Sequence, residues 1–270
     1  MIAGVGLIGG SIASALRKRQ PQIRVVGLVR DAARYAAAVE CGLLHDVVEQ
    51  PTDVDDVDLA VACTPVDQIV PTLTAVHAAH PTALLTDAGS TKVTVARKGR
   101  SLAARFVPAH PLAGSERTGW QWADADLFEG KVCLLTPISG ESPSIEVADF
   151  WRALGMTLLP AAPEDHDRWL AFSSHLPHLA AAALVNAIDA PRDVRATGYR
   201  DTTRIAAGSA EVWTAIVREN AGPIRDAIAD LVRELTTVDS FIAEGDFDAV
   251  HEWLARAAAE RRGDSPVEPT

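Results

Sequence analysis

The sequence predicts an α/β protein, with a doubly wound parallel sheet in its N-terminal half and an all-helical C-terminal domain. In the first half, short apolar runs alternate with amphipathic stretches, which is the pattern of βαβ units. The glycine-rich run Gly4–Ser11 follows the first apolar run and opens a helix. From Pro163 onward, Ala, Leu, Ile and Val recur at three- and four-residue spacing and no strand pattern remains.

The individual elements follow from this periodicity. Strands are expected at Ile2–Gly4, Arg24–Val29, Asp58–Cys63, Ala83–Thr86, Phe106–Pro108, Lys131–Thr136 and Met156–Leu159, the last of which closes the first domain. Helices are expected near 10–19, 31–40, 66–79, 91–104, 143–154, 164–189, 209–220, 223–243 and 246–261. The domains are therefore expected at 1–160 and 161–262, with a frayed tail at 263–270. Because only Met1–Ala3 precede the glycine run and strands usually have about five or six residues, we expect the true start to lie upstream.

Composition narrows the class of protein. The formal net charge of −11 argues against nucleic acid as a partner, because phosphates need a basic face. The sequence lacks both an apolar run of roughly 20 residues, which a membrane span requires, and the pattern of a signal peptide. The three cysteines match neither a disulfide framework nor a zinc site, so a cytoplasmic location is expected. An anionic substrate must be held by local arginines against the overall field.

The glycine run has the spacing of a dinucleotide-binding loop. Gly4 permits the tight turn, Gly6 lets a pyrophosphate approach the backbone, and Gly9 allows close packing of helix on strand. The phosphate then lies on the N-terminus of the following helix. This is a Rossmann-type domain for NAD or NADP, and the expected cofactor-binding residues are Gly4, Gly6, Leu7, Ile8, Gly9, Arg30 and Thr64.

The end of the second strand bears on the choice of cofactor. An NAD enzyme usually places an acid there for the ribose hydroxyls, whereas an arginine accommodates a 2′-phosphate. This strand ends in Val29-Arg30, which favours NADP. Alternatively, Arg30 is an ordinary surface residue and Asp31 caps the next helix.

The run His110-Pro111-Leu112-Ala113-Gly114-Ser115-Glu116 follows the apolar run Arg105–Ala109, which is expected to be the last parallel strand. Ligands of open α/β sheets bind at the carboxyl ends of strands. His110 therefore lies where it can meet a cofactor, and a histidine gains or loses a proton near neutral pH. The run indicates proton chemistry coupled to a nicotinamide.

Further clusters occur in a fixed order along the chain. They are Thr86–Lys92, Ser173–His178, Gly198–Arg204 and Trp213. Together with the glycine run and the His110 run, they resemble the prephenate/arogenate dehydrogenase family of tyrosine biosynthesis over about residues 2–255. The resemblance implies oxidative decarboxylation of a cyclohexadienyl dicarboxylate by NAD or NADP, and a helical domain that forms a homodimer. The apolar stripes of the helical half also predict a homodimer.

The resemblance also implies roles for individual residues. His110 takes the proton of the ring hydroxyl as a neutral base near its reference pKa, and Ser90 binds that hydroxyl or orients His110. Arg204 grips the ring carboxylate with its planar fork. The remaining substrate-binding residues are His178, Glu116, Trp213, Asp201 and Arg200. His175 and His178 are three residues apart, but because no third ligand is suitably spaced, no metal is expected.

Other functions stay open at this point. Arogenate or 4-amino-4-deoxyprephenate would need an acid near the substrate amine, which Glu116 or Asp201 supplies. A 6-phosphogluconate or β-hydroxyacid dehydrogenase shares the layout but places a catalytic lysine on the helical domain, and here no lysine follows Lys131. A non-catalytic NADP sensor would have no reason to keep His110, Ser90 and Arg204 together.

Overall fold

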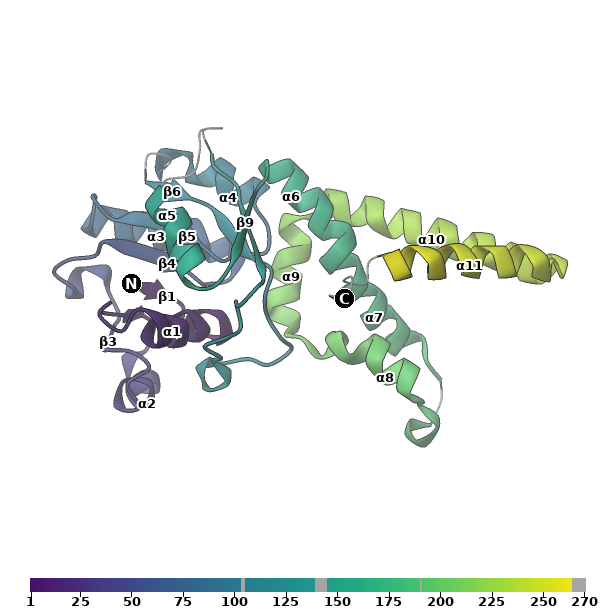
Figure 1. Cartoon of the computed structure of the whole chain (residues 1–270), viewed down its shortest axis with the longest axis horizontal. Helices are drawn as coiled ribbons and strands as arrows, with labels where there is room; N and C mark the ends of the chain where they lie inside the picture. The colour runs from purple at the N-terminus through teal and green to yellow at the C-terminus, as the bar shows by residue number, and fades with distance from the viewer. Residues whose placement is uncertain (103–104, 139–144, 190, 264–270) are drawn as a thin grey trace, which may run out of the picture. The chain divides into compact units, whose positions relative to one another are not determined.

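The computed structural model describes residues 1–102, 105–138, 145–189 and 191–263, which Figure 1 traces as coloured ribbon. By internal contacts the chain divides into two compact units, Met1–Ala221 and Gly222–Thr270. The boundary near residue 160 expected from the sequence is a different division and stays a prediction. The predicted tail lies outside the described residues beyond Gly263, as do the predicted helical positions 103–104 and 143–144. No helix in the described ranges is both long and apolar enough to cross a bilayer.

A six-stranded parallel sheet forms the centre of the first unit. Its strands are β1 (Ile2–Ala3), β2 (Val26–Leu28), β3 (Asp46–Val48), β4 (Leu59–Ala62), β5 (Leu84–Asp87) and β6 (Phe106–Val107), in the order β3-β2-β1-β4-β5-β6. This order reverses direction between β1 and β4, which is the point where Rossmann-type sheets bind dinucleotides. The predicted fold class is confirmed. The sequence analysis missed β3, a three-residue edge strand with an exposed first residue that gives too short an apolar run to detect.

Helices pack on the sheet through two separate hydrophobic cores. One core includes residues of α1 (Leu7–Arg19), α2 (Ala36–Glu40) and α5 (Ile145–Ala153), and the other includes residues of α3 (Ile69–Ala79) and α4 (Val93–Lys98). The helices therefore cover both faces, as a parallel sheet requires. Trp151 of α5 is fully buried and donates from its indole Nε1 to Thr86 Oγ1 at 3.2 Å. This bond ties α5 to the strand that leads into the candidate site.

A second, three-stranded sheet corrects the prediction for the end of the first domain. Its strands are β7 (Ala109–Pro111), β8 (Val132–Leu135) and β9 (Thr157–Pro160), with β7 antiparallel and β9 parallel to β8. The predicted strands at 131–136 and 156–159 exist, but they belong to this second sheet, in which β8 pairs with both β7 and β9, and not to the parallel sheet. The sequence analysis missed β7 because Pro108 and Pro111 bracket a run too short to show alternation. Pro111 is tolerated because β7 is an edge strand.

The helices of the first unit after β9 are α6 (Pro163–Leu170), α7 (Leu176–Ala187), α8 (Thr197–Thr203) and α9 (Ala210–Glu219). The single helix predicted over 164–189 is interrupted by a π-helical turn at Ala171–His175. Pro177 explains the interruption, since its ring would clash with the carbonyl of Ser173 in a regular helix. The sequence analysis placed Gly198–Arg204 after a break, and most of this segment is helical.

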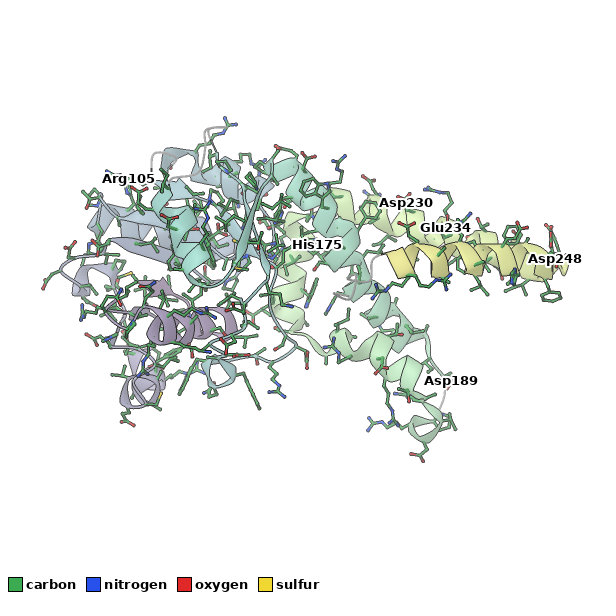
Figure 2. The ribbon with its side chains drawn as sticks, in the orientation of Figure 1. Arg105, His175, Asp189, Asp230, Glu234 and Asp248 are labelled. Carbon is green, nitrogen blue, oxygen red and sulfur yellow. The ribbon has the colours of Figure 1, made fainter. Side chains whose placement is uncertain are left out.

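The second unit consists of the long helix α10 (Ala221–Glu244), counted from Gly222, and α11 (Phe247–Gly263). Gly245 joins them with a φ of +72°, a left-handed conformation that favours glycine. Glu234, labelled in Figure 2, accepts a hydrogen bond from Trp253 Nε1 at 2.8 Å. This bond links α10 to α11.

The packing of the glycine run gives a test of the fold. Replacing Gly9 with Ala places a Cβ 2.2 Å from the carbonyl oxygen of Gly4, so backbone must shift. We expect Gly9→Ala to lower the free energy of unfolding by roughly 1–3 kcal/mol or more, measured by urea denaturation. Gly6→Ala is the matched control, because its Cβ meets nothing within 4 Å. Equal stability of the Gly9 variant and the wild type would contradict the packing described here.

Candidate active site

A cavity of about 1210 Å³ opens at the carboxyl ends of β1, β2 and β4. Four of the predicted cofactor residues line it, namely Gly4, Gly6, Arg30 and Thr64. Leu7 and Ile8 begin α1, and Gly9 packs α1 against β1. The cavity also receives residues from α9, so the first unit builds it from both the sheet and the helical segment.

The lining of this cavity fits the diphosphate of a dinucleotide. Gly4 has a φ of +88°, and a Cβ there would lie 2.9 Å from the carbonyl of Cys63, so only glycine fits the turn. Gly6 faces open space, which leaves the backbone approachable. The first turn of α1 carries no acidic residue and no side-chain cap, so its N–H groups are free for an anion. Thr64 Oγ1 is buried and has no partner among the described residues, which marks it as a hydrogen-bonding group for a ligand.

Arg30 is exposed and lines this cavity, as do the half-buried Tyr35 and the exposed Glu49. Asp31 lies at the start of the next helical turn but makes no side-chain capping bond. Glu49 accepts from the backbone N–H of Ala32 at 2.9 Å instead. The prediction that Asp31 caps the next helix is therefore wrong.

A buried ion pair lies under the loop that follows β5. The side chains of Asp87 and Lys92 are fully buried and 2.7 Å apart. The ammonium also donates to the carbonyls of Gly89 at 2.7 Å and Thr91 at 3.2 Å. The other carboxylate oxygen of Asp87 accepts from the backbone N–H of Ala109 at 3.0 Å. One side chain thus fixes both the β5 loop and the residue before His110.

His110 projects from β7, between two prolines, and is 8% exposed. Its Nδ1 lies 2.9 Å from Nε2 of His166, and its Nε2 has no hydrogen-bond partner within the described chain. Burial lowers the pKa of His110 well below its usual value, and His166, Lys92 and His175 lower it further. The imidazole is therefore neutral at neutral pH, as expected, but its pKa is not near the reference value as the sequence analysis assumed.

His166 and Asp167 at the middle of α6 form a hydrogen-bonded pair directly behind His110. His166 Nδ1 lies 2.8 Å from Asp167 Oδ1. The carboxylate of Asp167 also accepts from the backbone N–H groups of Lys92 at 2.7 Å and Val93 at 2.9 Å. Burial lowers the pKa of His166, although the hydrogen bond to Asp167 opposes that shift.

His175, labelled in Figure 2, lies in the π-helical turn and connects this pair to the β5 loop. Its Nδ1 lies 3.0 Å from Nδ2 of Asn220, which also donates to the backbone carbonyl of Asp167 at 2.7 Å. Burial lowers the pKa of His175 to about 4, while Asp167 and the backbone of Ser90 act in the opposite direction. Ser90 is partly buried at this end of the loop. The structure thus brings the loop of Ser90 to the histidine cluster.

The predicted substrate residues His178 and Trp213 are stacked on each other. Their ring centroids are 3.5 Å apart and their planes differ by 11°. Gly208 packs against the pair, and a Cβ there would lie 2.8 Å from Trp213 Nε1. Desolvation lowers the pKa of His178. Trp213 also meets His175 edge to face at 6.2 Å, so the stack adjoins the histidine cluster.

Arg204 and Glu116 form an exposed ion pair, with 2.8 Å between Nη1 and Oε2. Hydrogen bonding to its own backbone N–H and the charge of Arg204 lower the pKa of Glu116. Within the described ranges, no hydrogen bond or ion pair joins Arg204 or Glu116 to His110. Asp201 and Arg200 of α8 are exposed, and their side chains make no hydrogen bond or ion pair with other described residues. Their substrate-binding roles stay predictions.

The sequence analysis assigned no role to Asp87, Lys92, His166, Asp167 or Asn220. Asp87 and Lys92 stand inside the quoted cluster Thr86–Lys92, where a buried ion pair gives no periodic signal. His166 and Asp167 fall in the acidic first half of a helix and resemble a solvated face. Within the described residues, no group of three or more His, Cys, Asp and Glu side chains is arranged to hold a metal ion.

Comparison with known proteins places the chain among dehydrogenases. Residues 12–158 match the family model of the prephenate dehydrogenase nucleotide-binding domain, and residues 162–256 match the model of the prephenate dehydrogenase dimerization domain. The chain belongs to the prephenate dehydrogenase family. This confirms the resemblance inferred from the motifs and sets aside the 6-phosphogluconate and β-hydroxyacid dehydrogenase reading.

Named relatives and solved structures agree with the family. The chain is 30% identical to a prephenate dehydrogenase of Bacillus subtilis over 97% of its own length and 75% of the relative. It is 31% identical to a cyclohexadienyl dehydrogenase of Zymomonas mobilis, over 96% and 94% of the two chains. The structure of an Aquifex aeolicus prephenate dehydrogenase in complex with hydroxyphenyl propionate and NAD⁺ has a TM-score of 0.90, at 27% identity over 98% and 97% of the chains. Synechocystis arogenate dehydrogenase has a TM-score of 0.80, at 27% identity over 98% and 99%.

The buried histidines predict how stability depends on pH. Burial lowers the pKa values of His110, His166 and His175, so on acidification the unfolded chain takes up protons before the folded chain does. Stability is therefore fully present above the unfolded histidine pKa of about 6.5 and falls as the pH drops below it. We expect a smaller free energy of unfolding near pH 5 than near pH 7 in urea titrations followed by tryptophan fluorescence.

Variants assign this effect to the cluster. His175→Gln should reduce the difference between the two pH values, whereas His251→Gln, at an exposed position on α11, should leave it as in the wild type. A wild-type protein that is more stable near pH 5 would contradict the buried neutral cluster. So would an unchanged difference in the His175 variant.

Proposed function

We propose that this protein is an NAD(P)-dependent prephenate dehydrogenase, which converts prephenate and oxidised cofactor to 4-hydroxyphenylpyruvate, CO₂ and reduced cofactor. The observation that carries the proposal is His110, a buried neutral imidazole with a free Nε2, held beside the loop of Ser90 in a chain of this family. Because this nitrogen is unprotonated and has no hydrogen-bond partner among the described residues, it can accept a hydroxyl proton. When bound, an oxidised nicotinamide would serve as the oxidant by accepting the hydride from the carbon that bears this hydroxyl.

The proton moves twice in this scheme. His110 Nε2 takes the proton from the ring hydroxyl as the C–H bond of the same carbon breaks and the C–O bond gains double-bond character. The C–C bond to the ring carboxylate then breaks, CO₂ leaves, and its electron pair enters the ring and makes it aromatic. The phenol oxygen recovers the proton from His110, so no net proton is released. The low pKa of His110 favours this return, because the imidazolium is a strong acid in its buried setting.

Arg204 and Ser90 position the substrate in this proposal. The guanidinium of Arg204 binds the ring carboxylate, which would take the place that Glu116 now holds at 2.8 Å. This contact orients the ring and does not drive loss of CO₂, because holding the carboxylate more tightly in the ground state would not speed the reaction. Ser90 meets the hydroxyl from the loop next to His175. Trp213 and His178 form the wall beside the substrate side chain.

Prephenate is the proposed substrate because the family models and a curated relative are described as prephenate dehydrogenase. An amino group on the side chain would need an acid, which Glu116 would supply once the ring carboxylate has displaced it from Arg204. Asp201 has no partner among the described residues and is a second candidate for that role. Because similar proteins are named arogenate and cyclohexadienyl dehydrogenase, arogenate is assayed beside prephenate.

We further propose that the cofactor is NADP. Arg30 lines the cavity at the end of β2, where a 2′-phosphate of the adenosine ribose would lie. The same cavity contains Glu49, whose carboxylate is engaged by the backbone of Ala32. The charge of Arg30 is thus the feature of this rim that distinguishes NADP from NAD.

A homodimer in the cytoplasm is the proposed setting. The second unit carries large exposed apolar side chains in heptad-like spacing on α10, among them Val232, Leu235 and Ile242. The family model that covers this part of the chain is described as a dimerization domain. Sedimentation velocity at micromolar concentration should report a dimer, and a monomer would contradict the proposal. The cytoplasmic location rests on the three free cysteines.

A two-by-two assay tests substrate and cofactor together. Reduced cofactor is followed at saturating and limiting concentrations for prephenate or arogenate with NAD or NADP, and kcat/KM is compared. We expect prephenate with NADP to be best. Arg30→Ala should lower kcat/KM for NADP by about tenfold or more through loss of a charged contact, with little change for NAD. Arg34→Ala, at an exposed residue outside the cavity lining, is the control.

The outcomes of this assay separate the proposals. No reduction of either cofactor with any substrate would overturn the function. Higher kcat/KM with arogenate would overturn the substrate assignment, and higher kcat/KM with NAD would overturn the role of Arg30.

Replacement of His110 tests the catalytic base. His110→Asn should lower kcat by roughly 10²–10⁴-fold, because the general base is lost, while cofactor binding measured by fluorescence titration stays near the wild-type value. In the wild type, kcat/KM should be level near neutral pH and decline only well below pH 6.5, since the neutral form persists down to the lowered pKa. Full activity of the variant, or a wild-type decline that begins above pH 6.5 and disappears in the variant, would contradict this role.

A further inference from the structure

We propose that His166 and Asp167 are positioning residues that hold neutral His110 in the tautomer with its proton on Nδ1, which leaves Nε2 free to act as the base. The proposal deepens the function proposed above and rests on it only for the role of Nε2. It follows from three side chains in a line, His110, His166 and Asp167, joined by contacts of 2.9 and 2.8 Å.

The donor and the acceptor of each of these hydrogen bonds can be assigned by starting from Asp167. Its carboxylate is 2% exposed and receives the backbone N–H groups of Lys92 and Val93, which can only donate. An ionised carboxylate is an acceptor at every lone pair. The third partner, Nδ1 of His166, must therefore carry the hydrogen of its contact with Oδ1.

The remaining assignments follow from the single proton of each neutral ring. If His166 carries its proton on Nδ1, its Nε2 is an acceptor. The facing Nδ1 of His110 must then be the donor. The one ring proton of neutral His110 is thereby placed on Nδ1, and Nε2 keeps its lone pair. A neutral histidine in water prefers the opposite tautomer, so the pair behind His110 reverses the intrinsic preference.

The surroundings keep both rings neutral, which the argument requires. Burial lowers the pKa values of His110 and His166. The cation of Lys92 and the ring of His175 act on His110 in the same direction, while Asp87 and Asp167 act on His166 in the opposite one. A protonated His166 would donate from Nε2 and push the proton of His110 onto the catalytic nitrogen. The tautomer of His110 therefore depends on His166 being neutral.

His166 and Asp167 also stabilise the imidazolium that forms when His110 holds the substrate proton. The imidazolium then donates from Nδ1 to His166, which in turn donates to the carboxylate. Hydrogen bonds in such a chain polarise one another, so part of the positive charge is stabilised by Asp167 without contact between Asp167 and the substrate. Asp167 and His110 thereby play the parts of the orienting acid and the base in a triad, with a second imidazole between them.

His166 is the better residue to change, because Asp167 also anchors the backbone at the start of α4. His166→Phe keeps a ring of similar size, removes the acceptor for His110 and leaves those backbone contacts in place. His166→Gln is the conservative rescue, since its side-chain carbonyl reaches the position of Nε2 and accepts from His110. Asp165→Asn is the control, on the same helix but with a half-exposed side chain that is paired with Arg168.

The direct experiment is ¹⁵N NMR of the full-length protein labelled at histidine, without substrate. The signals of His110 are assigned by their absence from the spectrum of His110→Asn. In the wild type and in Asp165→Asn we expect the proton of His110 on Nδ1. In His166→Phe we expect it on Nε2, and in His166→Gln again on Nδ1. A wild-type His110 with its proton on Nε2 overturns the proposal.

Kinetics with prephenate supply the second measurement. We expect His166→Phe to lower kcat by roughly 10²–10³-fold with KM within a few-fold of the wild type, and His166→Gln to recover at least tenfold of that loss. Full kcat in His166→Phe, with His110 still protonated on Nδ1, overturns the proposal. If the wild type fails to oxidise prephenate, the proposed function fails, whereas the tautomer of His110 is decided separately by NMR.

Discussion

The buried ion pair of Asp87 and Lys92 is the interaction on which the rest of the site depends. One oxygen of Asp87 holds the ammonium and the turn at Gly89, and the other holds the backbone N–H of Ala109. Lys92 in turn donates its backbone N–H to Asp167. The loop of Ser90, the strand of His110 and helix α6 are thus joined through two carboxylates.

A buried ion pair of this kind contributes more to fixing one conformation of the site than to the free energy of unfolding. Desolvation of two charges offsets much of their attraction, but removal of one partner typically costs about 3–5 kcal/mol because the other is left buried and unpaired. Each atom of the pair in this protein has a partner, since the ammonium meets one carboxylate and two carbonyls. The geometry behind His110 is therefore one that the chain cannot relax without leaving a charge unsatisfied. The positive charge of Lys92 also helps to keep His110 neutral.

The sequence predicted the parts of the protein that have a local or periodic signal. The glycine run placed the cofactor loop because Gly4 and Gly9 meet steric limits that only glycine satisfies. The parallel sheet followed from apolar runs that are buried on both faces. By contrast, β7 has only three residues, follows Pro108 and ends in Pro111, and its partner β8 lies more than twenty residues away. Pairing and not local pattern therefore makes it a strand. His166 and Asp167 gave no signal because their function depends on contact with a strand over fifty residues earlier in the chain.

The central claim is that Nε2 of His110 faces the reacting hydroxyl. The most direct measurement is a crystal structure of the protein with oxidised cofactor and 4-hydroxyphenylpyruvate. The account predicts the phenol oxygen within about 2.6–3.2 Å of His110 Nε2, with His110 Nδ1 still on His166. A phenol oxygen held elsewhere, with His110 Nε2 bonded to protein backbone, would contradict it.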